Sequence, residues 1–65
     1  MLSKFKNFIE SGELLRRIVL RKEEVKRITR LSYYHIFETE PNFDFGHEIA
    51  NDFEINQLYY QLEKL

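Results

Sequence analysis

Only one proline and two glycines interrupt the 65 residues of this chain, so few positions force a helix to end. Pro41 is the strongest of them, because it cannot continue a helix and biases Glu40 toward extended geometry. Asn42 and Asp44 follow it, and both are common turn formers. The stretch 39–46 is therefore expected to connect helical segments on its two sides.

Before this connection, apolar residues recur at helical spacing. Five of them fall on one face, each within about 40° of Leu14 at 100° per residue: Leu14, Ile18, Val25, Ile28 and Ile36. They predict a helix from Glu13 to about Glu38, either unbroken or interrupted near Arg21, which lies on the same face. A separate first helix is expected before Ser11-Gly12, which punctuates the chain, because apolar residues there are also helically spaced: Leu2, Phe5, Phe8 and Ile9.

After the connection, residues 47–65 would present two opposed apolar faces on a straight helix. One face would carry Ile49, Phe53 and Tyr60; the other would carry Ile55, Leu58, Leu62 and Leu65. A helix of this kind needs a core on both sides, and so short a chain offers little bulk for one. The pattern therefore favours two short helices that are separated by a turn near Glu54.

Together these segments predict a single all-α domain over residues 1–65. It would contain three or four short helices in a tri-helical arrangement, with a helical hairpin as the alternative. A domain of this size buries only roughly 60% of the surface of its unfolded chain. The chain has no cysteine, so disulfides and thiolate metal sites cannot stabilise it. A homodimer is therefore expected.

The charges are divided between the two halves of the chain, although the net charge is only −1. Seven basic residues and two glutamates lie between positions 16 and 30, and seven acidic residues and one lysine lie between positions 31 and 65. This division predicts either a face that binds a polyanion or head-to-tail pairing of two chains, and a solvated basic helix is the simpler alternative.

Residues 48–56, Glu-Ile-Ala-Asn-Asp-Phe-Glu-Ile-Asn, resemble the helix-turn-helix of compact, winged-helix-like DNA-binding regulators. Ile49 and Ala50 match an apolar residue followed by a small one, Phe53 and Ile55 match the apolar residues around the turn, and Asn56 matches a capping residue. Glu54 stands where that family usually has glycine. The resemblance covers roughly residues 47–65. A second, shorter resemblance, to excisionase-like regulators, covers residues 22–32 and the pair Ile36-Phe37.

The first resemblance implies a small DNA-binding regulator whose partner is double-stranded DNA. Its last helix would then present base-contacting and phosphate-contacting side chains, which are Gln57, Tyr60, Gln61 and Lys64. Because one lysine is a poor complement for phosphates, the preceding basic helix would supply further contacts through Lys26, Arg27 and Arg30.

The alternative function belongs to a different class, in which a helical hairpin binds a protein as small inhibitors, adaptors and anti-repressors do. Its contact residues would be Tyr33, Tyr34 and Phe37, which fall outside the apolar stripe. A turn at Glu54 would favour DNA, and a straight helix over residues 47–65 would favour the protein-binding hairpin.

Catalysis, metal binding and membrane insertion are not expected. His47-Glu48 begins a His-Glu-x-x-His zinc signature, but its fifth position is Asn51. The sequence has no glycine-rich phosphate loop and no nucleophile with a paired base, so no enzyme activity, cofactor or small-molecule substrate is expected. No apolar stretch approaches the ~20 residues of a membrane span, and Met1-Leu2-Ser3-Lys4 lacks the apolar run of a secretory signal, so the expected location is cytoplasmic.

Overall fold

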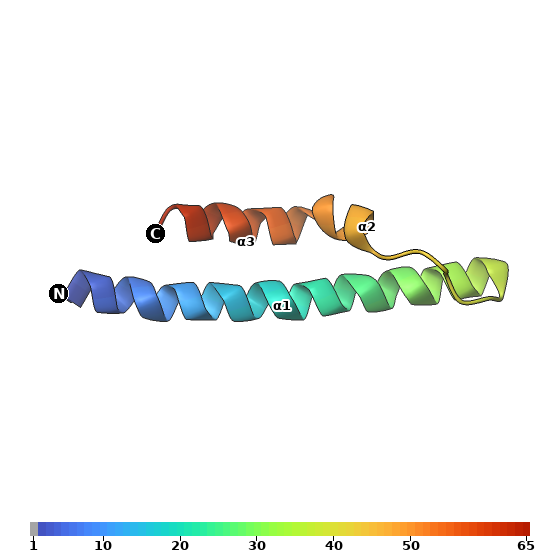
Figure 1. Ribbon diagram of the computed structural model, residues 1–65, viewed down its shortest axis with the longest axis horizontal. Coiled ribbons are helices and arrows are strands. Elements are labelled where there is room, and N and C mark those ends of the chain that lie inside the picture. The colour runs from blue at the N-terminus through green and yellow to red at the C-terminus, as the bar shows by residue number, and fades with distance from the viewer. Residues whose placement is uncertain (1) are drawn as a thin grey trace.

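The computed structural model describes the backbone of residues 2–65 and the side chains of residues 6–65. Within this range the chain forms three helices and no strand: α1 (Leu2–Phe37), α2 (Gly46–Ala50) and α3 (Phe53–Glu63). The predicted all-α class is thus confirmed. One helix is long, however, and the arrangement is that of a hairpin, in which α3 runs back antiparallel along α1 (Figure 1).

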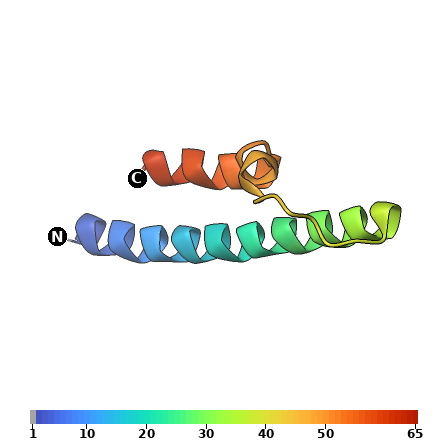
Figure 2. The ribbon, with the colours of Figure 1, turned by 45° about the vertical axis from the view of Figure 1, so that its right-hand side comes forward.

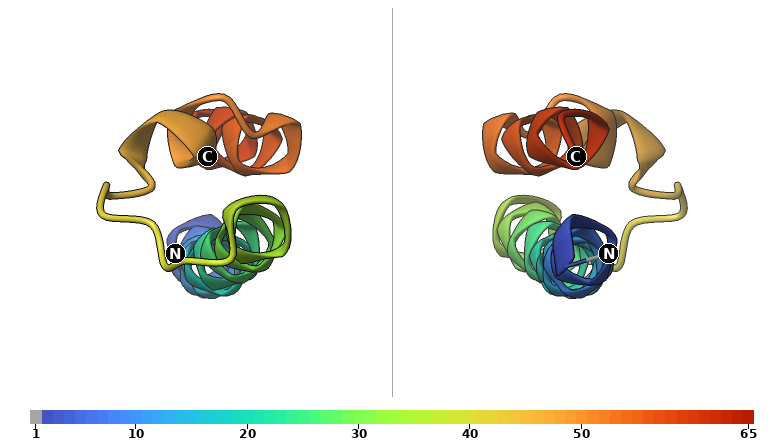
Figure 3. Two further views of the ribbon diagram at one scale, coloured as in Figure 1. Left: turned by 90° about the vertical axis from the view of Figure 1, so that its right-hand side faces the viewer. Right: turned by 90° about the vertical axis from the view of Figure 1, so that its left-hand side faces the viewer.

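The hairpin has two layers, with α1 in one layer and α2 and α3 in the other (Figure 3). The molecule is elongated, with extents of 54 × 15 × 14 Å. The connection over residues 38–45 leaves the far end of α1 and runs back along its last turns before it reaches α2 (Figure 1). α2 is turned out of line with α3, and the chain bends between the two (Figure 2).

α1 is continuous through Ser11-Gly12 and through Arg21, so the predicted separate first helix and the break considered near Arg21 are both wrong. A single interior glycine costs a helix only about 1 kcal/mol relative to alanine. Strong helix formers follow Gly12, and no proline follows until Pro41. In the resemblance to excisionase-like regulators Arg30 stands at the turn, where that family has glycine, and α1 is continuous there as well. The helix ends at Phe37, which agrees with the predicted end near Glu38.

Glu38 terminates α1 in a left-handed backbone conformation, with φ of 56°. Its backbone N–H donates to the carbonyl oxygen of Tyr34 at 2.7 Å. This geometry satisfies one of the last carbonyls of the helix, and glycine usually provides it because other residues pay a steric cost there.

The break in the C-terminal segment is correctly predicted, but its position is not. α2 ends at Ala50 and α3 begins at Phe53, so Glu54 lies in the first turn of α3 rather than in a turn between helices. The N-cap is Asp52, whose carboxylate accepts a hydrogen bond from the backbone N–H of Ile55 at 3.0 Å. Asn56, the predicted cap, lies inside α3 and donates from its side chain to the carbonyl oxygen of Ala50.

The core lies between α1 and α3 and is small. Its buried side chains are Leu14, Ile18, Val25, Ile55 and Leu58, and Leu62 packs against them. The predicted stripe is therefore confirmed at its first three positions. The last two positions of the stripe, Ile28 and Ile36, are exposed, so the prediction that they are buried is wrong. Ile28 lies about 80° around α1 from Ile18. Ile36 belongs to the last turn of α1, and this end of α1 extends beyond the helices of the second layer (Figure 1).

Candidate functional site

Arg21 joins the two layers of the hairpin by an ion-pair network. Its guanidinium donates to both carboxylate oxygens of Asp52, at 3.0 Å from Nε and 2.8 Å from Nη2. It also donates to Glu24 at 3.0 Å and lies 3.4 Å from a carboxylate oxygen of Glu54. The hydrogen bonds from Arg21, together with the N–H of Ile55, hold the pKa of Asp52 below its usual range, although burial opposes this shift. The same hydrogen bonds raise the pKa of Arg21 further above its ordinary value.

Much of the basic run is paired with acidic groups of the same chain. Besides Arg21, Lys26 lies 3.5 Å from Glu23, and Arg30 lies 4.0 Å from Glu40. Four cations in the run form no ion pair with another described side chain, namely Arg16, Arg17, Lys22 and Arg27. Lys22 instead donates a hydrogen bond to the Tyr59 hydroxyl at 2.9 Å. The charge division seen in the sequence is therefore satisfied in part within the hairpin itself.

The residues predicted to contact DNA from the last helix lie mostly on the side of α3 that faces away from α1. At 100° per residue, Gln57, Tyr60 and Lys64 share that side, opposite the buried Leu58. The ammonium group of Lys64 lies over the ring of Tyr60, 5.0 Å from its centroid. Gln61 lies at the flank of the hairpin, where it lines a shallow pocket with α1 residues Glu10, Glu13, Leu14 and Arg17.

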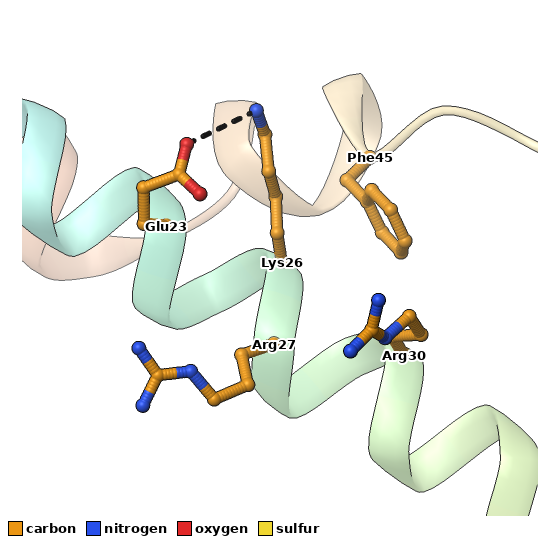
Figure 4. Close-up of a pocket in the computed structure, with 5 residues that line it drawn as sticks. All are labelled: Glu23, Lys26, Arg27, Arg30 and Phe45. Atoms are coloured by element: carbon orange, nitrogen blue, oxygen red, sulfur yellow. Dashed lines mark ion pairs between the residues drawn. The ribbon is translucent and has the colours of Figure 1, made fainter.

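The predicted basic contacts on α1 point in different directions. Lys26 extends toward Glu23, Arg30 lies beneath Phe45, and Arg27 points away from both (Figure 4). Arg27 lies about 180° around α1 from Ile18, which faces α3. The structure therefore does not bring Arg27 onto the same face as the predicted contact residues of α3.

The residues predicted to bind a protein lie at the far end of the hairpin. Tyr33 is half-buried and packs against Phe37 and Phe43, with ring centroids 4.6 Å and 5.4 Å away, so only part of its side chain is accessible to a partner. Phe45 extends this row from Phe43, at 5.6 Å. Tyr34 and Phe37 remain exposed. Ile36, which the apolar spacing predicts to be buried, is also exposed, because no helix of the second layer covers the last turns of α1. It lies about 100° around α1 from Phe37 and lines a pocket with Leu31, Ser32 and His35.

Exposed large apolar side chains outnumber buried ones, at fifteen against five among the described residues. Most of them lie on α1, which has only one helix layer against it. Seven of the fifteen lie on two surfaces: the far end of the hairpin, with Tyr34, Ile36, Phe37 and Phe43, and the side of α1 opposite α3, with Ile9, Leu20 and Leu31. The other eight are spread over the rest of the hairpin. Folded monomers rarely leave so much apolar surface in contact with water unless it serves an interaction.

Neither a cluster of metal-ligating side chains nor a membrane-spanning helix occurs among the described residues. No three histidine, aspartate or glutamate side chains of residues 6–65 are grouped so that they could hold a metal ion. None of the three helices is both long enough and apolar enough to cross a membrane. The side chain of Asn51 lies 3.4 Å from the ring nitrogens of His47 and donates to its backbone oxygen at 2.8 Å.

Known proteins offer no further guide to these surfaces. Comparison of the chain with family models, with curated proteins and with solved structures gave no match. Function is therefore inferred from the positions, exposure and charges of the side chains themselves.

Proposed function

We propose that this chain is a non-catalytic, protein-binding helical hairpin that holds an apolar helix of another protein against its far end. The apolar end of the hairpin consists of Tyr34, Ile36, Phe37 and Phe43. The observation that carries the proposal is their exposure, because Ile36 is 69% exposed and Phe37 is 59% exposed at the end of an ordered helix. An apolar surface on a rigid helix loses little conformational freedom when a partner covers it.

The charges around the apolar end indicate the chemistry of the partner. Residues 38–46 carry three acidic side chains and no basic one: Glu38, Glu40 and Asp44. Arg30 is the one basic side chain that the structure pairs with this loop, through its contact with Glu40. A helix whose apolar face is flanked by lysine or arginine would complement this end in both hydrophobicity and charge.

Duplex DNA is the partner that the sequence resemblance favours, and the break between α2 and α3 is nearer to the turn expected for it than to a straight helix. Two other observations count against it. Lys26 and Arg30 are already close to acidic groups, so fewer free cations remain to replace the counterions of DNA. Arg27 and the outward side of α3 face opposite directions, so one duplex would not contact both sets.

The proposal is tested by placing a photo-cross-linking amino acid at Ile36 in the cell that makes the chain. The protein that is captured is then purified, and its affinity is measured for the wild-type chain and for Ile36→Ser. We expect at least a roughly tenfold loss of affinity in Ile36→Ser. Val19→Ser is the matched control, because Val19 is also a β-branched residue of α1 and is exposed to 58%, away from the apolar end. It should bind like the wild type.

Equal loss in both variants would overturn the proposal, and so would the absence of a cross-linked protein. Duplex DNA is titrated in parallel at several salt concentrations. Salt-dependent binding that is lost in Lys64→Ala and unchanged in Ile36→Ser would replace the proposal by the DNA-binding function.

A further inference from the structure

A second apolar surface runs along the side of α1 that faces away from α3. It carries Ile9, Leu20 and Leu31, which are separated by eleven residues each and therefore advance by only about 20° per interval around the helix. All three are exposed, Leu20 to 60% and Leu31 to 57%. The line spans about 33 Å at 1.5 Å per residue.

Charged residues complete this surface in a fixed order. Glu13 lies between Ile9 and Leu20, and Arg27 lies between Leu20 and Leu31, both close to the same line. Glu13 stands at the edge of this surface, where it also lines the shallow pocket with Gln61. Neither of these charged side chains forms an ion pair within the part of the chain that the structure describes. We call these five positions the outer face of α1: Ile9, Glu13, Leu20, Arg27 and Leu31.

We infer that two copies of this chain pair antiparallel through the outer face of α1, with Leu20 on the two-fold axis. In that register, the residue numbers of two facing positions add up to 40. Leu20 then meets Leu20 of the second copy, and Ile9 meets Leu31. Glu13 meets Arg27, and the symmetry of the pair produces this contact twice.

The residues beside the outer face agree with the same register. In antiparallel helix pairs, residues on one flank meet residues on the same flank of the other helix. Arg16 and Glu23 lie on one flank, and Arg17 and Glu24 lie on the other. Along the axis, Arg16 is level with residue 24 of the second copy, and the nearest residue on its own flank is Glu23. For the same reason Arg17 lies nearest Glu24 of the second copy, so these flanking contacts are also between opposite charges.

The opposite orientation is unfavourable. A parallel pair in register would place Glu13 against Glu13 and Arg27 against Arg27. Its flanks would bring Arg16 near Arg17 and Glu23 near Glu24, since opposite flanks meet in parallel pairs. Like charges in contact oppose association, so the charge order selects the antiparallel pair.

A second copy is the occupant that these observations favour, because the outer face is its own complement in both charge and hydrophobicity. The hairpin also has a reason to associate, since it buries only five large apolar side chains among the described residues. Leu31 borders the apolar end, since it lines one pocket with Ile36. Leu20, Glu13 and Arg27 lie outside the apolar end, and because the register rests on them the inference does not depend on the proposed function.

Sedimentation at concentrations up to about 100 µM tests the pairing. The wild-type chain should sediment as a dimer, and Leu20→Glu should weaken self-association at least roughly tenfold, because it places two carboxylates at the axis. Val19→Glu is the matched control, since Val19 is adjacent and similarly exposed but lies about 100° around the helix. A wild-type monomer at every concentration would overturn the inference, as would a dimer that resists Leu20→Glu.

Charge exchange tests the register. Glu13→Arg alone and Arg27→Glu alone should each weaken the dimer, because each creates like-charge contacts with the second copy. The double variant should recover most of the association, since it restores opposite charges in the exchanged order. These two positions lie about 21 Å apart along one helix, so recovery cannot come from within the chain. If the double variant lost as much association free energy as the two single variants lose together, this register would be excluded.

Cross-linking tests the orientation. Because the chain has no native cysteine, a thiol reagent can join only the cysteines that are introduced. A short bismaleimide linker should join two chains that carry Leu20→Cys. It should also join a chain with Ile9→Cys to a chain with Leu31→Cys, but not two chains with Ile9→Cys. Efficient linking of two Ile9→Cys chains would show a parallel pair and overturn the inference.

Discussion

Asp52 accepts two hydrogen bonds from the Arg21 guanidinium while it caps the first turn of α3. One carboxylate thus fixes the start of one helix and joins it to the middle of another, across 31 positions of sequence. This contact sets where α3 begins, and α3 supplies the buried Ile55 and Leu58 to the core. The pairing of the basic and acidic halves of the chain is centred on it.

Substitutions at Asp52 should separate its two roles. Asp52→Asn keeps a good N-cap but loses the charge that Arg21 contacts, whereas Asp52→Ala loses both. The loss of the cap alone should lower the free energy of unfolding by about 1 kcal/mol, so the alanine variant should be less stable than the asparagine variant by that amount. Urea denaturation at one fixed protein concentration measures the difference. Equal stability of the two variants would show that the cap contributes nothing.

Acid should remove part of the stability through the same residue. The ordinary pKa of an aspartate is near 3.8, and the hydrogen bonds from Arg21 hold the pKa of folded Asp52 below this value. The unfolded chain therefore binds a proton at higher pH than the folded chain does. The contribution of Asp52 is complete above the ordinary pKa and is lost as the pH falls through the pKa of the folded state. Thermal melts from about pH 6 to about pH 3 should show the melting temperatures of wild type and Asp52→Asn converging in acid. A constant difference over this range would contradict the role of the carboxylate charge.

The sequence predicts the elements of this fold better than it predicts their ends. Helical spacing correctly identified the buried face of α1 at Leu14, Ile18 and Val25, because neighbours along one helix determine that periodicity. The two opposed faces of residues 47–65 correctly indicated a break. Its position was wrong by two or three residues, since the choice between Asp52 and Asn56 as the cap depends on Arg21, which is distant in sequence.

The predictions of exposed surfaces are limited in the same way, because exposure depends on residues that are distant in sequence. Tyr34 and Phe37 are exposed as the protein-binding alternative required, but Tyr33 is half-buried against Phe43, a contact that depends on the path of the loop. Ile36 fits the apolar stripe by spacing alone, and it is exposed because the second layer does not reach it. Exposure at the end of a helix depends on how far its neighbours extend, and periodicity does not contain that information.

Gly12 should tolerate alanine with a gain in stability. A Cβ atom at this position would have no heavy atom within 4 Å, and the residue lies inside α1. Alanine reduces the conformational freedom of the unfolded chain, so Gly12→Ala should raise the free energy of unfolding by about 0.5–1 kcal/mol. A denaturant melt measures the change. A loss of stability instead would indicate that α1 is bent or broken at Ser11-Gly12, as the sequence suggested.

Glycine should have opposite effects at two glutamates. Glu38 holds a left-handed conformation at the end of α1, with φ of 56°, so Glu38→Gly should raise the free energy of unfolding by about 1 kcal/mol through relief of strain. Glu54 lies in the first turn of α3 and near Arg21. Glu54→Gly should lower the free energy of unfolding by roughly 0.5–1 kcal/mol, the usual cost of glycine within a helix. A helix-turn-helix with its turn at Glu54 would instead require that Glu54→Gly be neutral or stabilising. The sign of its effect in a thermal or denaturant melt therefore distinguishes the hairpin described here from that alternative, and Glu38→Gly serves as the control for a site where glycine should help.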